Sequence, residues 1–387
     1  MSLSHHLAIG VTRTMNVPFI DLARLTKSMK SEVLADWSAV FDKTEFVGGP
    51  RVGALEKALC ADLGVDRTIA CANGTDALVI GLQAMGVKAG TKVAIPNMTF
   101  WATYEAVAQL GGIPVLIDID PNDLQMSLPE FLCAYEAYRF DAAVLVHLFG
   151  WASPKLADFR KFCAEKNIAL LEDGAQCYGV KINGVPVLKG STVGTTSFYP
   201  AKVVGGCVDG GAIFANSEAL EKLIRSLCNH GRSAHYSYER NGWNSRMGGL
   251  QAAFLNHVVA RSGEIVADRR RSAEWYRKRL AGTDKLNIFA PPAGQDENGY
   301  LAVFTVADGV DVNAVTDGLK ARGIGFGRTY PETMDSQPPA VDAIKVGTLQ
   351  HSRKFCKSAL NLPLFFGITE PELEACASAL QEVLRGL

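Results

Sequence analysis

The sequence lacks several patterns that would point to particular classes of protein. Its nine cysteines occur singly, with no C-x-x-C pair, which argues against a zinc knuckle or a disulfide framework and favours a reducing compartment. None of the seven histidines lies in a metal-ligand spacing such as H-E-x-x-H. The formal net charge of -1 gives no overall attraction to nucleic acid or to an anionic membrane. We therefore expect neither a bound metal nor a nucleic-acid partner.

Long apolar runs are also missing. No stretch approaches the ~18 apolar residues of a membrane span, and residues 1–14 have neither the basic nor the apolar region of a signal peptide. We expect a cytoplasmic protein with no membrane association, in which residues 1–15 form an N-terminal extension. Yet 48% of the 387 residues are hydrophobic, which is enough for a sizeable buried core in more than one domain.

Short apolar runs alternate with helix patterns through the first half of the chain. The helix patterns include Asp76–Met85 and Lys155–Lys166, and most of the apolar runs are too uniformly apolar to have a wet face. This alternation predicts an α/β fold with a mainly parallel sheet of seven strands. The seven runs are Thr68–Ala72, Lys92–Pro96, Ile113–Asp118, Ala142–His147, Ile168–Glu172, Thr195–Tyr199 and Gly211–Ala215.

The second half of the chain has a different pattern. Gly249–Arg279 contains no proline and many helix formers, which predicts one long connecting helix with Arg269-Arg270-Arg271 on a solvated face. A strand candidate (Tyr300–Val306), a helix (Asn313–Arg322) and a capping box at Thr369 predict a smaller α+β domain. We divide the chain into an N-terminal extension (1–15), a segment packing on the small domain (16–45), a large domain (46–248), a connecting helix (249–282) and a small C-terminal domain (283–387).

Ligands of open parallel sheets bind beyond the carboxyl ends of the strands, so the polar residues at these ends are the first candidates for a binding site. The run ending at Cys71 passes through Asn73-Gly74-Thr75 into a helix. Backbone N–H groups at a helix N-terminus, with the Thr75 hydroxyl, can cradle a phosphate. The alternative is a plain helix N-cap, since asparagine and threonine are common caps.

A second strand end carries an acidic residue. The run Ile168–Glu172 leads directly to Asp173, and a buried aspartate is costly unless it has a partner. One suitable partner is a cationic ring nitrogen of a cofactor. The alternative is a structural carboxylate that caps the following turn.

A lysine and an aromatic residue follow two further strand ends. Lys202 lies in a proline turn followed by Gly205-Gly206, a setting in which a lysine is shielded from water, as Schiff-base lysines require. Phe100 follows Pro96 closely and could stack on a flat heterocycle. The alternatives are a solvated loop lysine and a core aromatic residue. Together the phosphate cradle, the acid, the lysine and the ring have the spacing of a pyridoxal 5'-phosphate (PLP) site.

Several motifs, in order along the chain, resemble the DegT/DnrJ/EryC1/StrS family of PLP-dependent sugar aminotransferases, which has the fold type I architecture of aspartate aminotransferase. The resemblance runs from about Val17 to Leu387. The motifs are Phe46-Val-Gly-Gly-Pro50, Asn73-Gly-Thr-Asp-Ala-Leu78, Asp118-Ile-Asp120, Val146-His-Leu-Phe-Gly150, Glu172-Asp-Gly-Ala-Gln176, Ser197-Phe-Tyr-Pro-Ala-Lys202, Asp209-Gly-Gly211, Asn229-His-Gly231, Gly242-Trp-Asn-Ser-Arg246 and Leu250-Gln-Ala-Ala253.

The resemblance implies a PLP cofactor and a role for each site residue. Lys202 would form the Schiff base and move the proton during transamination, and Asp173 would keep the pyridine nitrogen protonated. The remaining contacts to the cofactor would be Gln176 beside the phenolic oxygen, Phe100 stacked on the ring, Gly74, Thr75 and Ser197 on the phosphate, and Asn244 on the phosphate from the other subunit of a homodimer.

The same resemblance implies the reaction and its partners. An amino acid, usually glutamate in this family, would donate the amino group to a keto-sugar that is nucleotide-linked, in amino-sugar biosynthesis. A sugar dehydratase is an alternative on this fold but typically carries histidine in place of Lys202, and a non-catalytic regulatory protein is another. The chain departs from the family at two places. The family often has two acidic residues where this chain has Gly248-Gly249, and a Tyr-Pro-x-Pro-x-His pattern is common where this chain has Tyr330-Pro-Glu-Thr-Met-Asp335 without a histidine. Both regions are expected to face the sugar.

Overall fold

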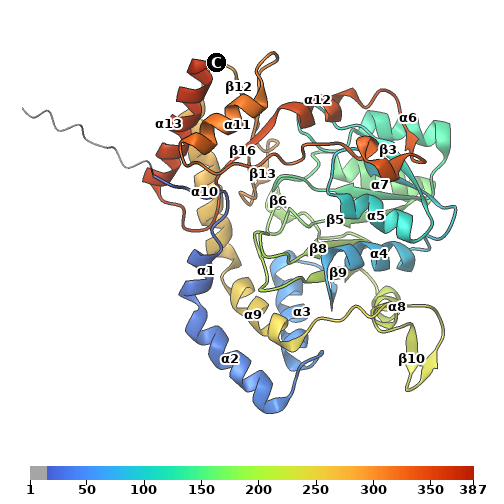
Figure 1. Cartoon of the computed structure of the whole chain (residues 1–387). Coiled ribbons are helices and arrows are strands. Elements are labelled where there is room, and N and C mark those ends of the chain that lie inside the picture. The colour runs from blue at the N-terminus through green and yellow to red at the C-terminus, as the bar shows by residue number, and fades with distance from the viewer. Residues whose placement is uncertain (1–14) are drawn as a thin grey trace, which may run out of the picture.

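The computed structural model describes residues 15–387 and contains a large eight-stranded sheet with a smaller α+β region beside it (Figure 1). All seven predicted runs are strands of this sheet, with ends that differ from the prediction by at most two residues. In spatial order the strands are β1 (Arg67–Cys71), β9 (Gly211–Ala215), β8 (Val193–Ser197), β5 (Ala169–Asp173), β4 (Ala142–Val146), β2 (Lys92–Pro96), β3 (Ile113–Ile117) and β15 (Ile344–Lys345).

The prediction of seven strands is wrong because an eighth comes from the C-terminal region. β15 pairs in parallel with β3 through Ile344↔Val115 and Lys345↔Leu116. A strand of two residues has no apolar run or alternation that would reveal it in the sequence. The sheet is mainly parallel, as expected, and β9 alone runs antiparallel to both of its neighbours.

Helices cover both faces of the large sheet, which explains why its strands are apolar throughout. In β4, for example, Ala143 and Leu145 pack on one face while Ala142 and Val144 pack on the other. One face is covered by α3 (Pro50–Leu63), α6 (Leu128–Tyr138) and α7 (Leu156–Lys166), and the opposite face by α4 (Gly74–Ala84), α5 (Trp101–Gln109) and α8 (Glu218–Cys228).

The stretch predicted as one connecting helix forms two. α9 (Gly249–Ala260) and α10 (Ser262–Leu280) meet at Arg261, whose backbone (φ -108°, ψ 7°) leaves the α-helical region. α9 is buried almost all round, whereas α10 leads to the smaller region. The run Arg269-Arg270-Arg271 is also not simply solvated, because Arg269 is buried.

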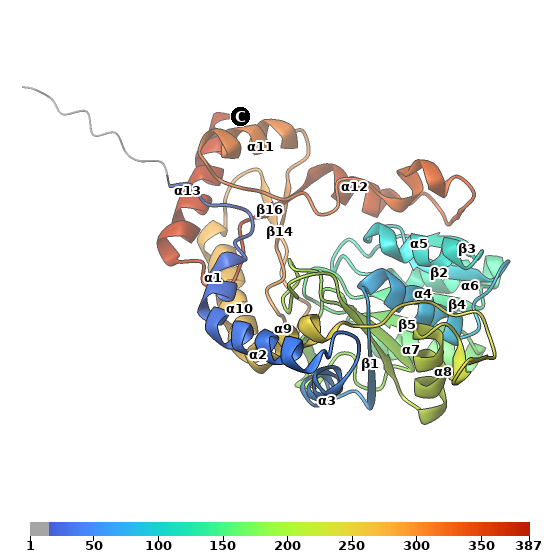
Figure 2. The same ribbon diagram turned by 60° about the horizontal axis from the view of Figure 1, so that its bottom comes forward.

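The smaller region has a sheet and a core of its own (Figure 2). Its antiparallel sheet has the order β12 (Leu286–Ile288), β14 (Ala302–Val306), β16 (Ala359–Leu362), and its helices are α11 (Val312–Ala321), α12 (Gln350–Ser358) and α13 (Glu370–Gly386). The strand predicted from Tyr300, the helix predicted from Asn313 and the capping box of Thr369 with Glu372 are confirmed.

The N-terminal segment divides between two neighbours. Val17 bridges to Ile324, and Arg24 of α1 (Ala23–Ser28) pairs with Glu372 of α13, so this part lies on the smaller region. α2 (Lys30–Lys43) instead packs against α9. The remaining short elements are β6 (Lys181–Ile182), β7 (Val185–Pro186), β10 (Arg232–Ala234), β11 (Ser237–Tyr238), β13 (Gln295–Asp296), η1 (Met334–Ser336) and η2 (Pro338–Ala340).

The residue boundaries that we assigned to the domains stay a prediction, and the expected extension lies outside the described residues except for Met15. From residue 15 to residue 387, no helix has both the length and the apolar character that a membrane crossing requires.

Candidate active site

The centre of the site is the buried carboxylate at the end of β5. Asp173 is 5% exposed, and its Oδ1 accepts a hydrogen bond from the Ala175 N–H at 2.9 Å. Burial raises the pKa of Asp173 above its usual value, although the Ala175 N–H and the charge of Lys202 act in the opposite direction. The carboxylate is therefore short of positive charge in the protein alone.

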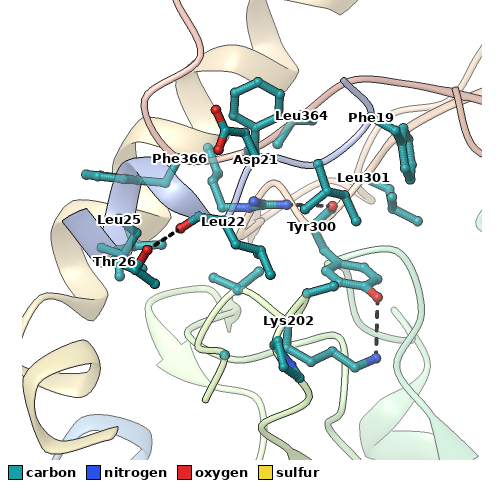
Figure 3. Close-up of a pocket in the computed structure, with 18 of the residues that line it drawn as sticks. Phe19, Asp21, Leu22, Leu25, Thr26, Lys202, Tyr300, Leu301, Leu364 and Phe366 are labelled. Carbon is teal, nitrogen blue, oxygen red and sulfur yellow. Dashed lines mark hydrogen bonds between the residues drawn. The ribbon is translucent and has the colours of Figure 1, made fainter. Parts of the chain in front are cut away.

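Lys202 extends into the site from a tight loop. Its Nζ lies 3.3 Å from the Tyr300 hydroxyl and 5.0 Å from the centre of the Tyr300 ring (Figure 3). The loop folds closely on itself, because a Cβ at Gly205 would lie 2.2 Å from the carbonyl oxygen of Pro200. Only glycine permits this turn, which fixes the direction of the half-buried lysine.

A cavity of about 120 Å³ lies behind the Lys202 loop, against the N-terminal segment (Figure 3). Most of its walls are apolar, including Leu22, Leu25 and Phe366. Arg269 also lines it and donates hydrogen bonds to the carbonyl oxygens of Gly299 and Tyr300. Burial lowers the pKa of Arg269 to about 10, so this arginine ties α10 to the start of β14 instead of facing water.

The first turn of α4 has the geometry that an anion cradle requires. Asn73 caps the helix by accepting a hydrogen bond from the Asp76 N–H at 2.8 Å. A Cβ at Gly74 would lie 2.7 Å from the Cβ of Ser197, so only glycine lets the end of β8 approach this closely. The structure thus brings Gly74 and Ser197 together, with Thr75 next along the chain, at the positive end of a helix.

Gln176 has a fixed orientation. Its Oε1 accepts a hydrogen bond from the Phe149 backbone N–H at 2.7 Å, and a backbone amide can only donate. Its Nε2 must therefore point the other way, where it donates to the Tyr330 hydroxyl. The amide nitrogen carries a second hydrogen, which Gln176 can offer to an oxygen of a ligand.

The two other candidates are exposed. Phe100 directly precedes α5 and is 62% exposed, unlike a core aromatic residue. Asn244 is exposed, and its Oδ1 accepts a hydrogen bond from Arg246 at 2.6 Å. The neighbouring Ser245 Oγ accepts one from the Ala72 N–H at 3.2 Å, which ties this motif to the turn leading into the cradle.

Two tyrosines at the site were not identified from the sequence. Tyr300 contacts Lys202, and Tyr330 contacts Gln176 although its segment was expected to face the sugar. Each contact joins residues about a hundred or more positions apart in the chain, which no local pattern reveals. A proline after Tyr330 marks a turn but does not place its hydroxyl.

The departure at Gly248-Gly249 has a steric reason. The Gly249 N–H donates to the Phe46 carbonyl oxygen at 3.0 Å, so the two backbones are in direct contact. A Cβ at Gly249 would lie 1.9 Å from the carbonyl oxygen of Glu45. An acidic residue, as is frequent at this place in the family, cannot occupy position 249 with this backbone.

These residues fit a PLP cofactor. The Thr195 Oγ1 is buried on the strand beside Asp173, where it acts to lower the pKa of that carboxyl but makes no other hydrogen bond within residues 15–387. The raised pKa of Asp173 likewise calls for a cation next to it. An uncompensated acid, a half-buried lysine, an anion cradle and an exposed aromatic ring meet the needs of a pyridinium ring that bears a phosphate. The fold and the site define a PLP-dependent enzyme of fold type I.

Comparison with known proteins identifies the family. The chain belongs to the DegT/DnrJ/EryC1/StrS aminotransferase family, whose model matches residues 27–381. It is therefore a PLP-dependent aminotransferase.

Relatives match over nearly their whole length. The chain is 30% identical to UDP-N-acetyl-3-dehydro-alpha-D-glucosamine 3-aminotransferase of Acidithiobacillus ferrooxidans, over 97% of this chain and 100% of the relative. It is 33% identical to UDP-2-acetamido-2-deoxy-3-oxo-D-glucuronate aminotransferase of Pseudomonas aeruginosa, over 94% and 99%. A crystal structure of a DegT DnrJ EryC1 StrS aminotransferase from Brucella abortus superposes with a TM-score of 0.89 at 30% identity, covering 95% of this chain and 99% of that one.

Proposed function

We propose that the protein transfers the amino group of an amino acid, L-glutamate, to a nucleotide-linked keto-sugar, with Lys202 and Asp173 as its catalytic residues. The observation that carries the assignment of residues is the buried, uncompensated carboxylate of Asp173 beside the half-buried amine of Lys202. A structural aspartate or a solvated lysine would not have these surroundings. The sugar dehydratase alternative is not favoured, because position 202 is lysine.

Each residue has a defined task in this proposal. Bound PLP supplies a cationic ring that withdraws electrons from the substrate carbon beside the nitrogen. Asp173 holds the proton on the ring nitrogen, and Lys202 Nζ moves a proton to and from the reacting carbon. Gly74, Thr75 and Ser197 hold the phosphate, while Phe100 lies against the ring. Gln176 donates its second amide hydrogen to the phenolic oxygen.

The relatives support the class of acceptor. The names of both curated relatives describe aminotransferases that act on UDP-linked sugars with an oxidised carbon 3. An acceptor of this kind needs room outside the cofactor site for a nucleotide. The exposed Phe100 and Asn244 place the site at the surface, where a long substrate can enter.

Labelling of Lys202 tests the assignment. Borohydride reduction of the PLP-loaded protein followed by peptide mass spectrometry should place the cofactor on Lys202, and glutamate should shift the visible absorption band of the unreduced protein. Lys202→Ala should remain folded and lose turnover, because the amine that moves the proton is removed. A label on another lysine contradicts the assignment of residues, and a spectrum that glutamate leaves unchanged contradicts the proposed donor.

The site is proposed to be shared between two subunits of a homodimer. Asn244 is exposed, and its motif borders the turn leading into the cradle, so it is accessible to a second copy of the chain. Closed two-fold dimers are also the commonest assembly of soluble enzymes. In this arrangement Asn244 of one subunit contacts the phosphate held by the other.

Mixing Asn244→Ala with Lys202→Ala, at a PLP concentration too low to load Asn244→Ala, tests the sharing. Asn244→Ala should weaken PLP binding about tenfold to a hundredfold, the effect of one lost contact to a charged group. When it is mixed with Lys202→Ala, mixed dimers collect both lesions in one site and leave the other intact, so activity should partly return. Subunit exchange without any return of activity would refute the shared site.

A further inference from the structure

Every polar atom of Asn97, which follows β2 at its carboxyl end, forms a hydrogen bond within the protein. It is fully buried, and its backbone N–H donates to Ile117 at 2.7 Å while its carbonyl oxygen accepts from the Met334 N–H at 2.8 Å. Its Oδ1 accepts from the Asp335 N–H at 3.0 Å, and its Nδ2 donates to Asp335 Oδ1 and Ser352 Oγ, each at 2.9 Å. A buried amide so completely paired has one orientation.

Asp335 is the charged partner in this cluster. Its side chain is 3% exposed and accepts hydrogen bonds from Asn97, from the Thr333 hydroxyl at 2.6 Å and from the guanidinium of Arg353. Burial acts to raise the pKa of Asp335, but the bonds from Arg353, Thr333 and Asn97 outweigh it and hold the pKa below its usual value. We call Asn97, Thr333, Asp335, Ser352 and Arg353 the Asp335 clamp.

The clamp joins two walls of the active site. One wall is the loop that runs from Asn97 to Phe100 on the large sheet. The other is the segment from Tyr330 to Asp335, which leaves the smaller region and continues to β15 at the edge of the large sheet, from where α12 leads back to β16 of the smaller region (Figure 2). A second link between the large sheet and this C-terminal segment is Asp118, just after β3, whose carboxylate accepts hydrogen bonds from the backbone N–H groups of His351 and Ser352 in α12.

Resting on the proposed function, we propose that Asp335 is a positioning residue for the transamination site. It pins the Tyr330 wall to the Phe100 wall, so that the Tyr330 hydroxyl accepts one hydrogen of Gln176 and directs the other toward the bound cofactor. Asp335 itself is fully occupied by the clamp and acts through Tyr330.

The clamp therefore affects the site through orientation, and the lysine, the acid and the phosphate cradle come from other elements. Loosening it should leave cofactor loading intact. It should change the hydrogen bonding around the phenolic oxygen, which the visible absorption band reports, and it should widen the space for the sugar. The first effect appears as a shift of the pH midpoint of the band, and the second as a higher KM with a smaller change in kcat.

The test compares Asp335→Ala and Asp335→Asn with Asp308→Asn in the PLP-loaded full chain. Asp335→Ala removes every bond of the carboxylate, whereas Asp335→Asn keeps an oxygen for Asn97 and Thr333 and loses the charge that faces Arg353. Asp308 forms an exposed ion pair with Lys354, the residue after Arg353, so Asp308→Asn is a matched control for loss of one acid beside α12. Amide hydrogen exchange of residues 97–100 and 330–336 is measured beside the band midpoint, KM and kcat.

We expect Asp335→Ala to lose exchange protection in both segments, to shift the midpoint of the band and to raise the KM for the keto-sugar about tenfold, the effect of one lost hydrogen bond to a charged group. Asp335→Asn should show a smaller effect of the same kind, and Asp308→Asn none. Lost protection with an unchanged midpoint and KM would make the clamp merely structural and overturn the proposal, as would unchanged protection. A parent protein without a glutamate-sensitive band would refute the proposed function and this inference together, whereas unaltered Asp335 variants of an active parent would refute the inference alone.

Discussion

Glu172 and Asp173 are consecutive residues at the end of β5, both almost fully buried, and the protein treats them in opposite ways. Their side chains point to opposite faces of the sheet. Arg160 donates two hydrogen bonds of 2.8 Å to Glu172, and His147 lies 3.7 Å from it. These partners outweigh the effect of burial, so the pKa of Glu172 is lowered while that of Asp173 is raised.

Under the proposed function, the difference separates a structural charge from a catalytic one. A buried carboxylate with its own arginine stabilises the fold and is unavailable to a ligand. The charges near Asp173, including that of Lys202, do not outweigh its burial, so this carboxylate is costly to keep and a cation bound beside it would stabilise it. Burial alone therefore does not mark the active site, because the two neighbours share it. What distinguishes Asp173 is that the charges and hydrogen bonds around it do not outweigh the effect of burial on its pKa.

The largest effect should come from removing the charge of Asp173. Asp173→Asn keeps the size of the side chain but cannot hold a proton on the ring nitrogen by charge. We expect PLP to bind and turnover to fall by about a hundredfold to a thousandfold, as for loss of one preorganised electrostatic contact. Steady-state rates with glutamate and a keto-sugar measure this. Activity within a factor of two of the parent would refute the role.

The thermal stability of Asp173→Asn without PLP further tests the contrast between Asp173 and Glu172. Because the raised pKa reflects a penalty on the charged form, Asp173→Asn without PLP should unfold at the same temperature as the parent apoprotein or at a higher one. Clear destabilisation of the apoprotein would place Asp173 with the structural carboxylates.

The second largest effect should be a loss in the free energy of unfolding when the partner of Glu172, Arg160, is removed. Arg160→Ala leaves the buried Glu172 with His147 alone beside it, and breaking a buried pair costs about 3–5 kcal/mol. We expect denaturant unfolding near pH 7 to show this loss while the absorption band of bound PLP stays unchanged. Arg139→Ala is the matched control, because Arg139 pairs with Glu136 in full contact with water and should contribute close to nothing.

The pH dependence of that loss follows from the sign of the shift. The folded pKa of Glu172 is below its unfolded value, so in the parent its contribution is present above the unfolded pKa and is lost as pH falls through the folded one. Without Arg160, only His147 opposes the effect of burial, so the folded pKa of Glu172 is higher in the variant than in the parent. The gap in stability between parent and variant should therefore shrink as pH falls from about 7 towards about 4, the ordinary range of a glutamate. A constant gap would contradict this account.

The sequence alone was sufficient for the parts of the molecule that repeat a local rule. Buried parallel strands are continuous apolar runs, so seven strands and the polar residues at their ends could be located. Gly74 and Ser197 could be assigned to one cradle only through the family resemblance, yet the structure gives the reason, since a Cβ at Gly74 would collide with Ser197.

What could not be predicted depends on contacts between distant segments. Tyr300 and Tyr330 reach the site through hydroxyl groups whose partners lie on other elements, and neither has a local signature. Arg269 was expected on a solvated face because consecutive arginines are usually exposed, but it is buried and donates hydrogen bonds to the carbonyl oxygens of Gly299 and Tyr300, just before β14. A strand of only two residues, such as β15, is defined by the backbone pairing it makes in the folded protein, so its residue types do not predict it.

β15 has a consequence for how the chain folds as it is made. The other seven strands of the sheet are complete once Ala215 has been synthesised, whereas their outermost neighbour begins only at Ile344. At roughly 5–20 residues per second, the edge of β3 stays open on the ribosome for on the order of ten seconds. An open edge with free N–H and C=O groups is a template for pairing with other chains. The last third of the chain thus supplies the strand that covers the edge of β3. A nascent chain that stops before Ile344 leaves this edge open to pairing with other chains.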